Sequence, residues 1–100
     1  MALFRRMLGD VLRDQRVRRG MTLREVAAEA RVSLGYISEI ERGQKEASSE
    51  LLASLCAALG VPLSAVLREV SDLVALEEAA AGLRRLPVAA TSEPVVTSAA

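Results

Sequence analysis

Few residues of this chain have side chains suited to catalysis or metal binding. The 100-residue sequence contains no histidine, which removes the commonest general base and the commonest metal ligand. Its single cysteine, Cys56, leaves no internal disulfide framework or multi-cysteine metal site, and its apolar neighbours indicate a small core residue. Adjacent carboxylates such as Glu77 and Glu78 are typical of a solvated helix face. The composition therefore predicts that the chain is not an enzyme and carries no metal or cofactor.

The segment RVSLGYISEIERG, residues 31–43, offers a different chemistry, namely hydrogen bonding to base edges. Ser33 is placed to cap a helix that stops at Gly43, and Ile37 and Ile40 are spaced to enter a core. The period of about 3.6 residues per turn then fixes which positions face outward together. They are Leu34, Gly35, Ser38, Glu39 and Arg42.

Small groups on that outward face would let the helix lie deep in a DNA major groove, which is about 12 Å wide. There Leu34 could meet a thymine methyl group, Ser38 either kind of base edge, and Glu39 the amino group of cytosine. A helix exposed only to water gains nothing from Gly35, which costs about 1 kcal/mol in helix propensity relative to alanine. The alternative is that the segment is simply one helix of a bundle.

Caps, glycines and prolines divide the chain into five helices and indicate an all-α fold. The expected spans are residues 4–19, 22–30, 33–42, 48–59 and 62–86. The second begins at a capping box, TLRE, in which Thr22 and Glu25 satisfy each other's backbone N–H groups. The fourth is capped by Ser48 or Ser49. The last is opened by Pro62 and either continues to its end or bends into a sixth helix.

The second and third helices are joined only by a tight turn at Arg31 and Val32. They must therefore cross steeply, with Ala27 as the small residue at the crossing. The side chains expected to pack inward are Val26, Ala30, Val32, Ile37 and Ile40. We expect a DNA-binding domain over residues 1–70, a helical extension over 71–86 and a disordered tail over 87–100.

The formal net charge is zero, but the charges are unevenly distributed. Residues 1–31 contain eight arginines and four acidic residues, whereas residues 47–100 contain three arginines and six acidic residues. The first part is therefore the one suited to a polyanion. Since no stretch has the apolar length of a signal sequence or a membrane span, we expect a cytoplasmic protein without a membrane partner.

The stretch TLREVAAEARVSLGYISEIERG resembles the helix-turn-helix of the Cro/phage-repressor-like (XRE) family of transcription factors. The likeness covers about residues 11–67, and the pattern S-x-x-Y-I-S-x-I-E-R-G is specific to the family. It implies a five-helix, phage-repressor-like domain and a transcriptional regulator that binds double-stranded DNA. The residues implied in base readout are Leu34, Gly35, Tyr36, Ser38 and Glu39. Those expected to contact phosphates are Thr22, Leu23, Arg24, Arg31, Ser33, Arg42, Gln44 and Lys45.

Two residues depart from the family pattern. Leu23 stands where many relatives have a glutamine that clamps a phosphate, and either Arg24 or Arg31 is expected to replace that contact. Arg31 stands where many relatives have glycine, so the turn is expected not to require a left-handed residue. The family pattern also implies an ion pair between Arg16 and Glu41. We assign that pair to architecture, because a half-buried carboxylate without a partner is costly.

Four stretches show a closer resemblance, to actinobacterial activators of genes for ATP-dependent proteolysis by Clp. They are LGDVLR, TLREV, ARVSLGYISEIERGQKEASSELL and VSDLVALEE. This resemblance implies an activator of Clp protease and related stress genes, with RNA polymerase as a candidate partner. The alternative is an antitoxin-like or bridging protein-interaction module, because the XRE fold also serves those roles.

One recognition helix reads only a few base pairs, so we expect a two-fold dimer on a palindromic operator with half-sites about 34 Å apart. The expected interface is an apolar stripe; the alternative is that this stripe folds back onto its own domain. The stripe consists of Leu73, Leu76, Ala80, Leu83 and Leu86. The chain ends in Ala99 and Ala100, which resemble tags read by Clp-type unfoldases. The end is thus either a degradation tag, with Clp protease as partner, or an ordinary frayed terminus.

Overall fold

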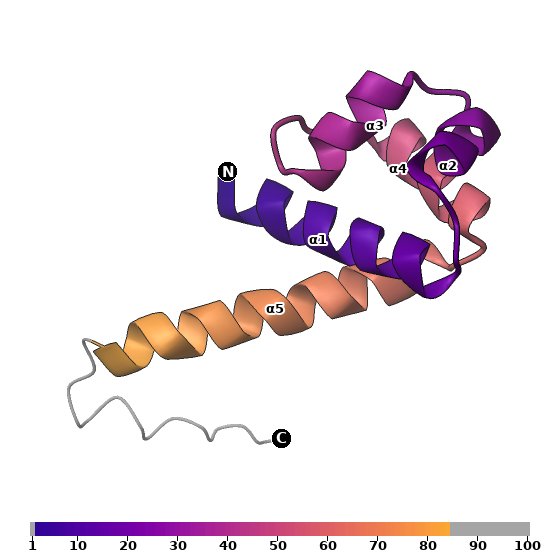
Figure 1. The fold of residues 1–100 in the computed structure, drawn as a ribbon. Helices are drawn as coiled ribbons and strands as arrows, with labels where there is room; N and C mark the ends of the chain where they lie inside the picture. The colour runs from indigo at the N-terminus through magenta and orange to yellow at the C-terminus, as the bar shows by residue number, and fades with distance from the viewer. Residues whose placement is uncertain (1, 85–100) are drawn as a thin grey trace.

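The described part of the chain consists of five helices (Figure 1). The structure is a computed structural model that describes the backbone of residues 2–84. The helices are α1 (Ala2–Arg18), α2 (Leu23–Ala30), α3 (Leu34–Glu41), α4 (Ser49–Leu59) and α5 (Leu63–Arg84). The all-α, phage-repressor-like fold expected from the sequence is confirmed, and α5 is one continuous helix without a bend into a sixth. The side chain of Leu83, Leu86 and the tail with Ala99 and Ala100 lie outside the described residues.

Side-chain caps begin three of the helices. Thr22 Oγ1 accepts from the backbone N–H of Glu25 at 3.0 Å, and the Glu25 carboxylate accepts from that of Thr22 at 2.8 Å, which completes the predicted capping box. Ser33 Oγ caps α3 by accepting from the N–H of Tyr36 at 3.1 Å. Of the two serines before α4, Ser48 is the cap. The starts of α2, α3 and α4 are therefore fixed by local hydrogen bonds.

The turn between α2 and α3 corrects one expectation. Arg31 adopts the left-handed conformation, with φ 61° and ψ 46°, although the arginine at this position led us to expect a turn without that requirement. The left-handed residue lets the N–H of Val32 reach the carbonyl of Ala27 at 3.0 Å, which closes the end of α2. The tight connection between the two helices thus imposes a backbone conformation that disfavours any residue but glycine.

The core lies where α1, α2, α3, α4 and the first half of α5 meet. Ile37 and Ile40 of α3 are each 2% exposed, and Ala27 is buried at the crossing of α2 and α3. Val32 is half-buried against this core. The buried apolar residues are Met7, Leu8, Val11, Leu12, Val26, Ala27, Ala30, Ile37, Ile40, Leu55, Cys56, Leu59, Val61, Val66 and Val70. One side of α3 is therefore fixed inside the domain, as its spacing predicted.

The backbone of α1 lies directly against the C-terminal end of α3. A Cβ atom at Gly9 would sit 2.5 Å from the carbonyl oxygen of Ile40 and 2.6 Å from that of Glu41. Gly43, with φ +75°, approaches α1 in the same way, since its Cβ would lie 2.8 Å from Cα of Arg6. These two contacts position the end of α3 relative to α1.

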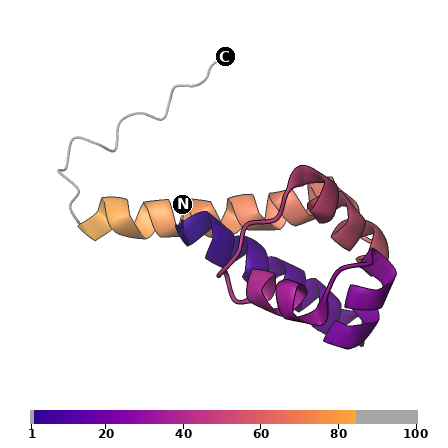
Figure 2. The same ribbon diagram turned by 90° about the horizontal axis from the view of Figure 1, so that it is seen from above.

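Helix α5 packs along α1 and then extends beyond it, as two views of the ribbon show (Figures 1 and 2). A bend of 105° at Gly60–Pro62 separates it from α4. Within residues 2–84, no single helix has the length and apolar character needed to cross a membrane; α4 and α5 pass that measure only when the bent pair is taken together. Beyond the end of α1, the last turns of α5 stand apart from the core (Figures 1 and 2).

Candidate nucleic-acid interface

Part of the outward side of α3 is exposed. Leu34 is 37% exposed, and Gly35 and Arg42 are exposed as well. A Cβ atom at Gly35 would find no heavy atom within 4 Å, so packing within the described structure does not require glycine there. Because glycine costs about 1 kcal/mol in a helix interior relative to alanine, its presence favours a role in which an external partner approaches this face of α3 closely.

Ser38 and Glu39 are half-buried, and basic side chains from the end of α3 and the following loop lie beside them. Arg42 donates a hydrogen bond to Ser38 Oγ and, at 3.2 Å, to Gln44 Oε1. Nζ of Lys45 lies 4.0 Å from Oε1 of Glu39. The polar groups of the outward face are thus paired with one another and arranged before any partner arrives.

Tyr36 has a structural contact that the sequence did not reveal. Its side chain is half-buried and its hydroxyl donates to the backbone carbonyl of Glu46 at 3.0 Å. The Glu46 carboxylate in turn lies 3.3 Å from Nη1 of Arg5 on α1. The loop that carries Gln44 and Lys45 is therefore tied to both α3 and α1.

Arg16 and Glu41 form the ion pair that the family pattern implied. Nε and Nη2 of Arg16 donate to the two carboxylate oxygens of Glu41 at 2.8 and 3.1 Å, and Nη1 donates to the carbonyl of Met21 at 3.0 Å. The two side chains are only 15% and 9% exposed. The hydrogen bond to Glu41 raises the pKa of Arg16 above its ordinary value. This pair joins α1, the turn before α2 and the last residue of α3.

The residues expected to contact phosphates lie at helix starts, in turns and in the loop after α3. Thr22 and Ser33 cap α2 and α3, where N–H groups and the helix dipole favour an anion. Arg24 and Arg31 are exposed, and Leu23 is half-buried against the core. In the sequence, these positions lie before the first residue and after the last residue of α3.

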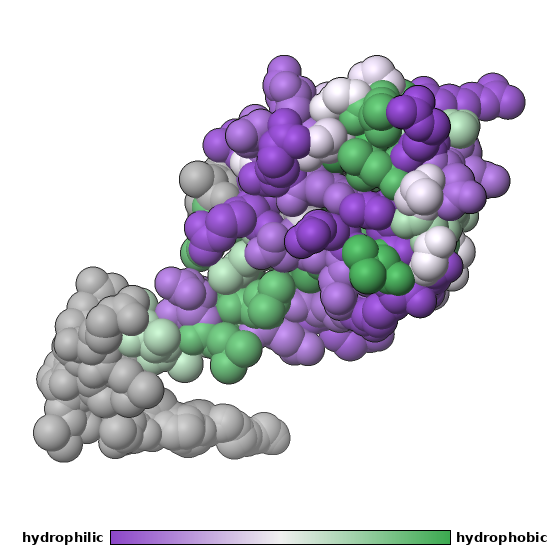
Figure 3. Space-filling model, in the orientation of Figure 1, coloured by the Kyte–Doolittle hydropathy of each residue, from purple (hydrophilic) through white to green (hydrophobic). Residues whose placement is uncertain are grey.

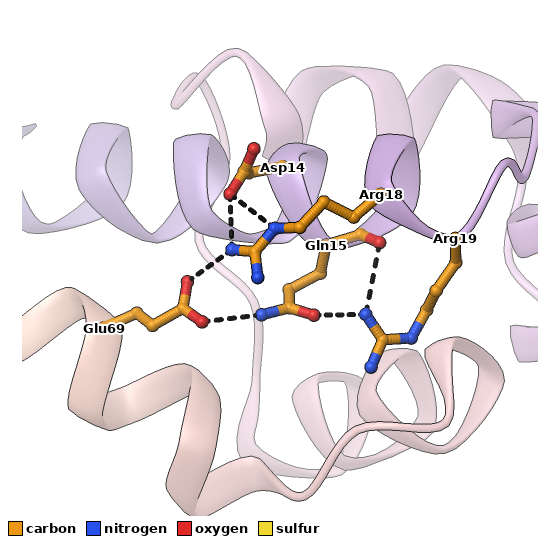
Figure 4. A network of polar contacts seen from close by, with 5 residues as sticks. All are labelled: Asp14, Gln15, Arg18, Arg19 and Glu69. Atoms are coloured by element: carbon orange, nitrogen blue, oxygen red, sulfur yellow. Dashed lines mark hydrogen bonds and ion pairs between the residues drawn. The ribbon is translucent and has the colours of Figure 1, made fainter.

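A polar network that sequence reasoning missed joins α1 to α5 (Figure 4). Gln15 is 3% exposed, and its Nε2 donates to Glu69 at 2.7 Å, while its Oε1 accepts from Arg19. Arg18 connects Asp14 and Glu69. The hydrogen bond to Asp14 raises the pKa of Arg18. The signal in the sequence was a glutamine on the apolar side of α1, which needed a partner once buried.

The predicted dimer stripe on α5 begins against the core and then emerges from it. Leu73 and Val74 are half-buried and pack on the core, whereas Leu76 is 68% exposed. The space-filling view shows hydrophobic side chains gathered along α5 where it leaves the rest of the molecule, which is mainly hydrophilic on this face (Figure 3). Leu73 therefore belongs to the packed domain, whereas Leu76 is open to solvent.

Residues 12–66 match the model of a helix-turn-helix family. The chain belongs to this family, in its XRE-type branch of transcriptional regulators. Over 77 residues it is 58% identical to the transcriptional regulator ClgR of Mycobacterium tuberculosis, which covers 77% of this chain and 69% of that protein. It is also 37% identical over 63 residues to the HTH-type transcriptional regulator DdrOP3 of Deinococcus deserti, which covers 63% of this chain and 49% of that one.

Among solved structures, the clp gene regulator ClgR from Corynebacterium glutamicum superposes with a TM-score of 0.75 at 48% identity, over 90% of this chain and 96% of that one. The restriction-modification controller protein C.AhdI from Aeromonas hydrophila superposes with a TM-score of 0.58 at 26% identity, over 65% and 92% of the two chains. The chain is thus a DNA-binding transcriptional regulator related to ClgR, and its relatives are regulators, not enzymes.

Proposed function

We propose that this regulator binds a palindromic operator as a homodimer in the cytoplasm and activates genes for Clp proteolysis and related stress responses. The observation that carries the DNA part is the division of α3, with Ile37 and Ile40 in the core and Leu34, Gly35 and Arg42 outside. The likeness to ClgR, described in one relative as a clp gene regulator, supports the choice of target genes.

In this proposal the outward side of α3 reads bases in the major groove. The readers are Leu34, Gly35, Tyr36, Ser38 and Glu39. The phosphate contacts come from Thr22, Leu23, Arg24, Arg31, Ser33, Arg42, Gln44 and Lys45. Leu23 would use its backbone N–H at the start of α2, since its side chain packs inward. Arg31 has the strongest physical support, because an exposed arginine held in a left-handed conformation costs stability that a bound phosphate would offset.

The second copy is assigned to the exposed part of α5. Leu76 and Ala80 lie beyond the core, and Leu83 and Leu86 continue the same spacing, with Leu73 at the inner edge. A mutual contact along this stripe would give the two-fold dimer that a palindromic operator requires. Sedimentation at decreasing concentration tests this assignment, and a stable monomer at micromolar concentration would contradict it.

Selection of duplexes from random DNA, followed by footprinting, tests the whole function. The expected result is a two-fold symmetric sequence with half-site centres about 10 base pairs apart, or a multiple of that, protected on one face of the duplex. Binding should weaken with salt at a log–log slope of roughly −0.9 for each phosphate contacted. No enrichment and no salt slope would favour the alternative of an antitoxin-like or bridging protein-interaction module.

Two partners belong to the same proposal. An activator recruits RNA polymerase, so transcription from a promoter with the selected site should rise when the protein is added to purified polymerase. The terminal Ala99 and Ala100 are proposed as a tag through which Clp protease removes its own regulator. Replacing both with aspartate should lengthen the half-life in cells, and an unchanged half-life would remove the tag.

A further inference from the structure

Three side chains, at the end of α3 and in the loop that follows, are joined by hydrogen bonds. The Arg42 guanidinium donates to Ser38 Oγ through Nη1 and to Gln44 Oε1 through Nη2. Ser38 lies one helical turn before Arg42, and Gln44 lies in the loop that follows. One guanidinium therefore holds the hydroxyl on the outward face of α3 and the start of the loop in a fixed relation.

This contact favours donation by the Ser38 hydroxyl. A serine hydroxyl has one proton to donate and two lone pairs to accept with. Here the oxygen accepts from a positively charged group, and the hydroxyl proton has no acceptor among the described residues. Its usual acceptor in a helix would be the carbonyl four residues earlier, and no such bond is formed. The Ser38 hydroxyl therefore has its proton free to donate outward, and the cation on its oxygen strengthens it as a donor, while one lone pair remains.

We propose that Arg42 is a positioning residue that sets the polarity of base readout, with Ser38 as donor and Glu39 as acceptor. The inference rests on the proposed base readout by α3. A partner base for Ser38 would carry a major-groove acceptor, such as N7 or O6 of guanine, N7 of adenine or O4 of thymine. Glu39 would take an exocyclic amine of cytosine or adenine, because a carboxylate only accepts. This gives Arg42 a positioning role in addition to the phosphate contact proposed above.

The two hydrogen bonds of Arg42 also explain why an arginine suits this position. A guanidinium presents several N–H groups in one plane and can reach two acceptors at once, while the single nitrogen of lysine is a flexible point charge. Nζ of Lys45 lies 4.0 Å from Oε1 of Glu39, so a single positively charged nitrogen stands beside the proposed acceptor. Arg42 therefore contacts Ser38, the proposed donor, and Lys45 lies beside Glu39, the proposed acceptor.

The test uses the full chain and the duplex that the wild type selects from random DNA. The base read by Ser38 is the one whose preference falls in Ser38→Ala. We expect Arg42→Ala to lower the preference at that same base by about three- to tenfold, the range expected for one hydrogen bond. The double variant should lose no more than either single variant, and Arg42→Lys should lose the preference although it keeps the charge. Arg68→Ala, which removes an exposed arginine on α5, should change nothing.

Base analogues test the polarity itself. Wild-type binding should fall about three- to tenfold when the contacted base lacks its major-groove acceptor, for example 7-deazapurine for a purine or 2-aminopurine for guanine, and Ser38→Ala should show no such loss. Loss only on removal of an exocyclic amine would overturn the donor assignment. A uniform loss in Arg42→Ala across all duplexes, with the preference intact and the salt slope lowered by about one unit, would show a phosphate contact instead. Failure of the wild type to select any sequence would overturn the proposed function as well, so the two failures are distinguishable.

Discussion

Arg16 and Glu41 are joined by two parallel hydrogen bonds of 2.8 and 3.1 Å, although 25 residues separate them in the chain. Glu41 is the last residue of α3, so the pair fixes the end of the recognition helix to α1. The third N–H group of the same guanidinium bonds the Met21 carbonyl before α2. A single side chain therefore links the end of α3 to two other elements.

Arg16→Ala should lower the free energy of unfolding by about 3 kcal/mol, because it leaves a largely buried carboxylate without its partner. Urea denaturation measures this loss. Arg13→Ala, which removes an exposed arginine from the same helix, is the matched control and should stay within about 0.5 kcal/mol of the wild type. DNA binding should weaken only as far as the folded fraction falls. Weaker binding with an unchanged unfolding free energy would contradict a purely architectural role.

Alanine at two helical glycines should have opposite effects. Gly9→Ala brings a Cβ atom to 2.5 Å from a backbone carbonyl of α3 and should cost several kcal/mol, or about 2 kcal/mol if α1 can shift. Gly35→Ala meets open space and should stabilise the fold by about 1 kcal/mol. The same Gly35 variant should bind DNA more weakly, because its methyl group stands on the outward face of α3. Thermal unfolding and DNA titration of both variants measure these effects, and equal stability changes would contradict the packing shown here.

Arg31→Gly should stabilise the protein by about 1 kcal/mol, because glycine adopts the left-handed conformation without the Cβ clash. It should also weaken binding to every duplex alike if Arg31 holds a phosphate. Arg31→Ala separates the two effects, since it keeps the backbone cost and removes the charge. An Arg31→Gly protein that is less stable than the wild type would mean that side-chain contacts, not backbone strain, dominate at this turn.

The stability of the fold should fall at alkaline pH through Cys56. Burial raises the pKa of this thiol, so the native state keeps its proton where the unfolded chain, with an ordinary thiol pKa of about 8.5, releases it. The native state then binds more protons, and the stabilisation present below about pH 8.5 is lost as the pH rises towards the raised value. Urea denaturation between about pH 7.5 and 9.5 measures this decline. Cys56→Ala should be less stable at neutral pH but flatter over that range, and an unchanged slope would assign the decline to other groups.

Local features of the fold were predictable because they depend on neighbouring residues. The capping box at Thr22, the cap at Ser33 and the inward side of α3 follow from hydrogen bonds and periodicity within a few residues. The close approach of Gly9 to α3 depends on residues more than 30 positions away, and nothing in its own neighbourhood signals it. The left-handed Arg31 was predicted wrongly, since residue preference favoured a different turn while the tight connection imposed this one.

The candidate interface was predictable only as a set of positions. Which residues face outward follows from the helical period, but the contacts among them depend on a loop whose path the sequence does not fix. The bond from Tyr36 to the carbonyl of Glu46 arises from the way the chain turns after Gly43, whereas Arg42 reaches Ser38 within one helical turn. The Gln15 network likewise needed the packing of α5 on α1.

Base reading by the outward side of α3 is tested by selection from random DNA with Glu39→Ala beside the wild type. Lys45→Ala is the control, and it should weaken all duplexes alike and reduce the salt slope by about one unit. Glu39→Ala should lose preference at one base position of each half-site, by about 1–3 kcal/mol, and keep it elsewhere. If Glu39→Ala selects the wild-type sequence with undiminished preference at every position, base reading by Glu39, one of the principal readers on α3, is contradicted.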